Sequence, residues 1–177
     1  MIGVGEKAAP PAATSGSGQD QLSAAVAFLL RSTGQRPQSE AEVRARLEAR
    51  HTPEAVVEAA IRRAHQLGAV DDAAFARAWV EDRGQQRGYG VTRLRLELRR
   101  RLVPELLIED ALAQLEGRDE LAVATELARD RSRQFPASLQ PEAVARRLQA
   151  FLMRRGYGPG LSQRVAVDVS GLGRVWD

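Results

Sequence analysis

Along most of the chain, apolar residues recur every three or four positions, and charged residues fill the positions between them. The helix that Thr52-Pro53-Glu54 is expected to open and Gly68 to end is an example, because its apolar residues fall on one face at 3.6 residues per turn; they are Val56, Val57, Ala60, Ile61 and Ala64. Few windows show the period-two alternation of a half-buried strand. The pattern therefore predicts an all-α protein.

Capping residues and turns indicate where the helices begin and end. Ser39 and Glu42 have the Ser-x-x-Glu spacing of a capping box. Asp71 is a predicted N-cap for the helix that follows it, and Gly88-Tyr89-Gly90 forms the next turn. On the helix after that turn, the residues expected to line the buried side are Val91, Leu94, Leu98 and Leu102.

The order of helix, turn, basic helix, short turn and helix occurs three times. Superposing Leu47, Leu98 and Leu152 aligns four apolar columns. The columns are Val43/Leu94/Leu148, Leu47/Leu98/Leu152, Val56/Leu107/Leu161 and Ala60/Ala111/Val165. Repeats of this size stack on their neighbours, so we expect a tandem array of three three-helix repeats, elongated and curved. The expected parts are a disordered tail over 1–20, repeats over 21–69, 70–117 and 118–170, and a frayed end over 171–177.

Composition narrows the class of protein. The apolar content of 44% is enough for a core. The absence of cysteine excludes disulfides and thiolate metal sites and fits a reducing compartment. The chain has no apolar run long enough to span a membrane, and its start lacks the layout of a signal peptide. We expect a soluble cytoplasmic protein.

The net charge of +3 conceals two strongly basic stretches. Residues 83–101 hold seven arginines and one acid, Glu97, and residues 129–164 hold eight arginines and two acids. Arginine presents a planar fork that binds carboxylates and phosphates. The stretches are therefore either a surface that binds a polyanion or an acidic protein, or solvated helix faces with ion pairs of their own.

The candidate chemistry is sparse. His51 and His65 have no metal-ligand spacing, and Asp71-Asp72 is better explained as a helix cap than as an acid/base pair. No phosphate loop or nucleophile elbow occurs. Tyr89 and Tyr157 each lie in a Gly-Tyr-Gly turn, where they could stack on a ligand or close one helix onto the next. We expect no enzymatic activity, metal, cofactor or small-molecule substrate.

Two runs of residues are specific enough to compare with known proteins. The first is Asp71-Asp72-x-x-Phe75-Ala76-x-x-Trp79-Val80-x-x-Arg83, followed by Gly88, Arg93, Glu97-Leu98-Arg99 and Val103. The second is Phe151-Leu152-x-Arg154-Arg155-Gly156-Tyr157. They resemble the central motif and the Leu-x-x-Arg-Gly-Phe element of the RecX family, regulators of the bacterial recombinase RecA. The resemblance covers about residues 21–168, and Leu102 stands where the family usually has glycine.

The resemblance implies tandem three-helix repeats that lie in the groove of the RecA filament on single-stranded DNA. It implies that the protein limits filament extension, ATP hydrolysis and strand exchange, with DNA as a secondary contact. We expect a monomer. The arginines expected to contact the filament or DNA phosphate are Arg83, Arg87, Arg93, Arg99, Arg100, Arg146, Arg147, Arg154 and Arg155. The alternatives are an autonomous helical DNA-binding protein or transcription factor, and a scaffold whose arginines only confer solubility.

Overall fold

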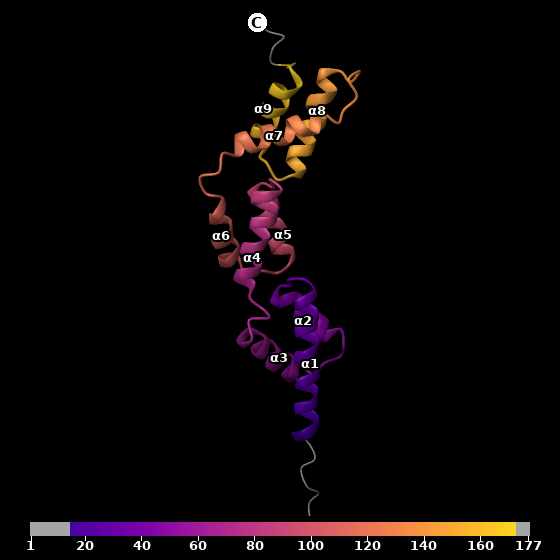
Figure 1. Ribbon diagram of the computed structural model, residues 1–177, viewed down its shortest axis with the longest axis vertical. Helices are drawn as coiled ribbons and strands as arrows, with labels where there is room; N and C mark the ends of the chain where they lie inside the picture. The colour runs from indigo at the N-terminus through magenta and orange to yellow at the C-terminus, as the bar shows by residue number, and fades with distance from the viewer. Residues whose placement is uncertain (1–14, 173–177) are drawn as a thin grey trace, which may run out of the picture. The chain divides into compact units, whose positions relative to one another are not determined.

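The computed structural model describes residues 15–172, and this part of the chain consists of helices, turns and short connections without a strand (Figure 1). The prediction of an all-α protein is confirmed. The chain divides into two compact units, residues 1–70 and 71–177, which we describe separately. Within the described residues, no helix combines the length and the apolar character needed to cross a membrane.

Over residues 15–70, the described part of the first unit, there are three helices, α1 (Ser15–Gln35), α2 (Glu40–Glu48) and α3 (Glu54–Gln66). Its core includes Ala25, Leu29, Val43, Leu47, Val57, Ala60, Ile61, Ala64 and Val70. Ser39 caps α2 as predicted, because its side chain accepts a hydrogen bond from the amide of Glu42. The Glu42 carboxylate accepts one from the Ser39 amide in return, which completes the capping box.

The predicted N-terminal tail is wrong for residues 15–20, because α1 begins at Ser15. Serine and glycine dominate this stretch and give no apolar period, so its sequence does not indicate a helix. Leu29 and Ala25 anchor the rest of α1 in the core, and extending an established helix requires no new nucleation. Residues 1–14 of the expected tail and 173–177 of the expected frayed end lie outside the described residues.

The second unit holds two three-helix repeats in succession. The middle repeat comprises α4 (Asp72–Val80), the π-helix η1 (Glu81–Gln86), α5 (Val91–Arg100), α6 (Glu105–Leu112) and the 3₁₀ turn η2 (Ala113–Leu115). The third repeat comprises α7 (Glu120–Ser132), α8 (Pro141–Arg154) and α9 (Pro159–Ser170). Asp71 caps α4 as predicted, because its carboxylate accepts a 2.9 Å hydrogen bond from the amide of Ala74.

The aligned apolar columns coincide with the core of each repeat. Val43, Leu94 and Leu148 are fully buried, and so are Leu98 and Leu152. The columns that begin at Val56 and at Ala60 are half-buried and buried, respectively, in all three repeats. The repeat predicted from spacing is therefore also a repeat of side-chain environment, in which the same position meets the same kind of neighbour.

The turn after the second helix is also repeated. The residues His51, Leu102 and Gly156 occupy equivalent positions and have φ values of 57°, 56° and 93°. The next residue in each turn donates its amide to a carbonyl five positions back, at 3.2–3.3 Å. This arrangement is a left-handed helix C-cap, in which glycine avoids the steric cost that other residues bear.

Leu102 corrects one sequence expectation. We expected it to continue the buried side of α5, but the helix ends at Arg100 and 72% of Leu102 is exposed. The spacing from Leu98 is helical, yet the left-handed backbone at Leu102 turns its side chain away from the core. The buried residue after the turn is instead Val103, at 5% exposure.

Candidate functional site

The two Gly-Tyr-Gly turns contact each other where the middle and third repeats meet. A Cβ atom added to Gly90 would lie 2.4 Å from the carbonyl oxygen of Gly156, and one added to Gly156 would lie 2.5 Å from the Cβ of Arg93. Gly156 also has a positive φ. This close backbone approach requires both glycines, and it joins the start of α5 in the middle repeat to the turn after α8 in the third.

Hydrogen bonds to main-chain carbonyls hold the junction. The amide of Gly90 donates to the Arg155 carbonyl at 2.8 Å. The guanidinium of Arg155 donates to the Arg87 carbonyl at 2.5 Å, and that of Arg93 donates to the Arg154 carbonyl at 2.9 Å. Arg93 and Arg155 were predicted to contact a partner. The structure places their guanidinium groups in contacts between the repeats.

The two tyrosines of these turns also serve the junction. The Tyr157 hydroxyl donates a 2.8 Å hydrogen bond to the carbonyl of Gly88, and only 4% of the residue is exposed. Burial raises the pKa of the Tyr157 phenol above its ordinary value, so the hydroxyl keeps its proton at neutral pH. The Tyr89 ring contacts two guanidinium groups, whose carbons lie 4.0 Å (Arg93) and 5.1 Å (Arg155) from its centroid. Of the two interpretations, closure of one helix onto another describes Tyr157.

Arg118 is a structural residue that the sequence argument missed. Its guanidinium donates to the carbonyl of Gly84, inside the π-helix, at 2.7 Å and to the carbonyl of Tyr89 at 3.1 Å. A π-helix shifts the hydrogen-bond register by one residue, and the arginine binds one of its carbonyls. Arg118 lies in the connection between the repeats and outside both basic stretches, so no sequence pattern marked it.

Arg83 and Arg93 gather around one carboxylate, Glu97. That carboxylate accepts hydrogen bonds from the indole of Trp79 at 3.1 Å and from Arg93 at 2.8 Å, and it pairs with Arg83 at 3.5 Å. The guanidinium of Arg83 also lies 3.7 Å from the Trp79 ring centroid. The single acid of the first basic stretch therefore organises two of its arginines, which limits their availability to a partner.

Two further arginines of α5 pair with α6. Arg99 forms a two-pronged contact with Glu105, with distances of 2.9 and 2.5 Å, and Arg95 does the same with Glu109 at 2.8 and 2.9 Å. The hydrogen bonds from these arginines lower the pKa of both glutamates, and the glutamates raise the pKa of both arginines. Because the pairs are solvent-exposed, their contribution to stability is small.

The remaining predicted arginines differ in their contacts. Arg87 pairs with Asp82 at 3.1 Å, and the guanidinium of Arg147 lies 5.8 Å from the ring centroid of Phe135. Within residues 15–172, the side chains of Arg100, Arg146 and Arg154 are exposed and take part in no ion pair. These three charges are the ones most available to a partner.

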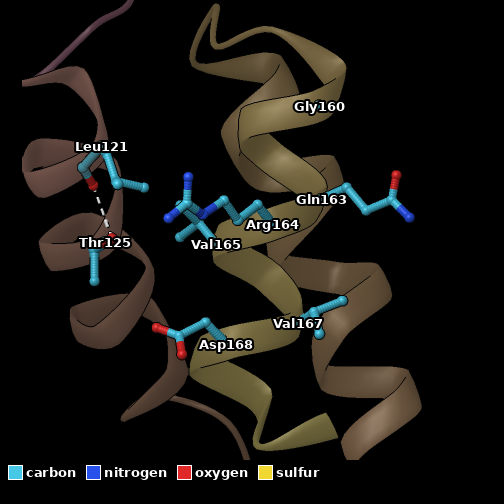
Figure 2. Close-up of a pocket in the computed structure, with 8 residues that line it drawn as sticks. All are labelled: Leu121, Thr125, Gly160, Gln163, Arg164, Val165, Val167 and Asp168. Atoms are coloured by element: carbon cyan, nitrogen blue, oxygen red, sulfur yellow. Dashed lines mark hydrogen bonds between the residues drawn. The ribbon is translucent and has the colours of Figure 1, made fainter. Parts of the chain in front are cut away.

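A groove between α7 and α9 is shown in Figure 2. It has a volume of about 600 Å³, and Arg164 and Asp168 extend from α9 towards α7. Its lining holds one basic and one acidic side chain, so the charges offset each other. Among the described residues, no group of three or more histidine, aspartate or glutamate side chains could hold a metal ion.

Comparisons with known proteins match this architecture. The family model for the second three-helix domain of RecX matches residues 71–112, and the model for its third three-helix domain matches residues 118–165. Two crystal structures of RecX proteins have the same fold. One, from Lactobacillus salivarius, has a TM-score of 0.68 at 16% identity and covers 85% of this chain and 97% of its own. The other has a TM-score of 0.66 at 23% identity and covers 84% and 73%.

Sequence relatives extend the match. The regulatory protein RecX of Thermobifida fusca is 37% identical over 158 residues, which is 88% of this chain and 83% of that protein. The regulatory protein RecX of Mycobacterium sp. (strain KMS) is 37% identical over 169 residues, or 90% of each chain. With two domain models matched in tandem and relatives aligned along nearly the whole length, the chain belongs to the RecX family of regulatory proteins.

Proposed function

We propose that this protein binds the filament that RecA forms on single-stranded DNA and inhibits its ATP hydrolysis, extension and strand exchange. Membership of the RecX family carries the proposal. The two repeats of the second unit support it, because their junction holds two groups of arginines in a constant relation. A filament offers repeated carboxylates and phosphates, and a ligand with regularly held cations can meet several of them together.

Within this proposal, the nine predicted arginines divide into three roles. Arg100, Arg146 and Arg154 contact the filament directly, because their charges are exposed and unpaired in the described part of the chain. Arg87, Arg99 and Arg147 contact the filament after releasing their present partners, which are Asp82, Glu105 and the Phe135 ring. The other predicted arginines hold the contact surface in place through their internal hydrogen bonds; they are Arg83, Arg93 and Arg155.

The test measures RecA ATPase activity and strand exchange on single-stranded DNA with this protein added at micromolar concentration. We expect inhibition by the unaltered protein and a loss of at least about tenfold in potency for the triple variant Arg100→Glu, Arg146→Glu, Arg154→Glu. The matched control reverses three other exposed arginines, Arg31, Arg62 and Arg164. Absence of inhibition by the folded, unaltered protein contradicts the proposed function.

The second candidate function is autonomous DNA binding, favoured by the same exposed arginines. It predicts base discrimination on duplex DNA in gel shifts without RecA, beyond the salt-sensitive attraction to phosphate. Salt-sensitive binding without discrimination agrees instead with DNA as a secondary contact of a filament regulator.

A further inference from the structure

A recess of about 390 Å³ lies between the end of α7 and the face of α8. Its volume falls in the range of small-molecule sites. It adjoins the junction at Arg154, whose carbonyl accepts the hydrogen bond from Arg93, and it shares no lining residue with the groove of Figure 2. The lining residues are Arg131, Gln134, Phe135, Pro136, Arg147, Ala150, Phe151 and Arg154.

The two walls come from α8 and from the end of α7 with the turn that follows it. Arg147 precedes Phe151 by four positions on α8, so the two side chains share a face of that helix, and Arg154 lies one further turn along it. Arg131 lies in the last turn of α7, and Phe135 lies in the turn after that helix ends at Ser132. Each wall therefore presents one aromatic ring and at least one guanidinium to the same space.

The rings are half-buried, and the arginines lie at the edge of contact with them. The guanidinium carbon of Arg131 is 5.4 Å from the centroid of Phe135 and 5.9 Å from that of Phe151. That of Arg147 is 5.8 Å from the centroid of Phe135. Cation–π attraction extends to about 6 Å, so these three contacts are loose and can yield to a ligand that stacks more closely. Phe151 has a closer contact with Arg155, whose guanidinium carbon lies 5.1 Å from the ring centroid and which the Arg87 carbonyl holds in place.

The charge of the recess is uncompensated by its own lining. Three arginines contribute, and no lining residue is acidic. Within the lining, Arg131 donates a 2.5 Å hydrogen bond to the side-chain oxygen of Gln134, and this amide carries no charge. The groove of Figure 2 has a larger volume but offsets its single arginine with an aspartate. The recess thus favours an anion, and its rings favour a flat aromatic group beside that anion.

We propose that this recess binds a nucleotide, with the base against Phe135 and Phe151 and the phosphate held by Arg131, Arg147 and Arg154. A nucleotide is favoured over inorganic phosphate or an acidic peptide because it supplies a π-face and a negative charge together. The source is either an unpaired nucleotide of a single strand or a free nucleotide. This proposal rests on the proposed function in one respect, because the RecA filament is what would bring single-stranded DNA to the recess. The test of nucleotide binding is carried out without RecA.

The test measures fluorescence anisotropy of a labelled oligothymidylate of about 15 nucleotides with the full-length protein alone. We expect the double variant Phe135→Leu, Phe151→Leu to weaken binding about tenfold, since leucine keeps apolar bulk but removes the stacking faces. Replacing the three arginines by glutamine is expected to lower the slope of log affinity against log salt by about 2. Thermal melts establish that each variant is folded.

Two matched pairs of variants distinguish binding in the recess from non-specific electrostatic attraction to the oligonucleotide. Arg133→Gln, at the C-cap of α7 and outside the recess, removes one positive charge and is paired with Arg131→Gln, which removes one inside the recess; only Arg131→Gln is expected to weaken binding. Ala150→Leu fills the recess without altering charge and is expected to weaken binding about as much as the loss of the rings. Ala122→Leu, at an exposed position of α7, is its control and is expected to have no effect.

Competition with thymidine monophosphate, inorganic phosphate and polyglutamate shows whether the recess binds a nucleotide of a single strand or a free nucleotide. Stronger competition by an unlabelled oligonucleotide than by the monophosphate supports a strand, and equal competition at equal nucleotide concentration supports a free-nucleotide site. The proposal is overturned if polyglutamate competes as well as the oligonucleotide while the ring variants and Ala150→Leu bind normally. Because RecA is absent throughout, that failure is distinguishable from a failure to inhibit the filament.

Discussion

Tyr157 donates its hydroxyl proton to the carbonyl oxygen of Gly88 across a distance of 2.8 Å, and this buried hydrogen bond joins two repeats. We expect Tyr157→Phe to lower the free energy of unfolding of the second unit by about 1–2 kcal/mol, because the Gly88 carbonyl loses its buried partner. Urea denaturation followed by tryptophan fluorescence measures the change. Tyr89→Phe is the control, since that ring is held by arginines rather than through its hydroxyl, and an equal loss there contradicts the explanation.

Gly90 has no room for a side chain. We expect Gly90→Ala to destabilise the second unit by at least about 2 kcal/mol, because the added methyl would meet the backbone of Gly156 at 2.4 Å and backbone cannot move as a side chain can. Thermal and urea unfolding measure the effect. Gly158→Ala is the control, as its Cβ would meet nothing within 4 Å. Comparable stability of the two variants is the result that disagrees with a close junction.

Leu102 carries both backbone strain and exposed apolar surface. We expect Leu102→Gly to raise the free energy of unfolding by about 0.5 kcal/mol, because the relief of a left-handed conformation exceeds the entropic cost of glycine. Leu96→Gly, also at an exposed leucine but inside α5, should instead lower it by about 1 kcal/mol. A loss of stability for Leu102→Gly contradicts this account and implies that the side chain contributes a contact.

Glu40 makes the stability of the first unit depend on pH. A hydrogen bond from His65, followed by one from Arg44, lowers the pKa of Glu40 below its ordinary value. A carboxyl group whose pKa is lower in the folded state stabilises that state above its ordinary pKa, and this stabilisation disappears as pH falls through the folded value. We expect Glu40→Gln to increase amide hydrogen exchange in α2 and α3 near pH 7, with a difference that shrinks towards about pH 3. If the difference in hydrogen exchange between the variant and the unaltered protein grows as the pH falls, the ionised Glu40 does not stabilise the folded state.

Local periodicity was sufficient to predict the helical repeats. Leu47, Leu98 and Leu152 could be aligned because a helix buries the same face along its length, and that rule depends only on neighbours in sequence. It failed at Leu102, where the helical spacing continues in sequence but the backbone turns. A glycine there would have marked the turn.

The candidate site was less predictable, because its arrangement depends on contacts between distant residues. The hydrogen bond from Arg93 to the Arg154 carbonyl joins positions 61 residues apart, and no local pattern indicates it. The charge count identified the basic stretches correctly, but it gave equal weight to Arg93 and to Arg100. The structure distinguishes them by their partners, and whether the exposed arginines contact RecA or DNA stays a prediction.

The contact between the two Gly-Tyr-Gly turns has a consequence for binding thermodynamics. Because hydrogen bonds to main-chain carbonyls join the middle and third repeats, the orientational entropy of linking them is lost during folding rather than during association. A partner that engages one repeat then meets the other at a high effective concentration. Loosening the junction should therefore shorten the lifetime of a complex even when every arginine on the surface remains in place.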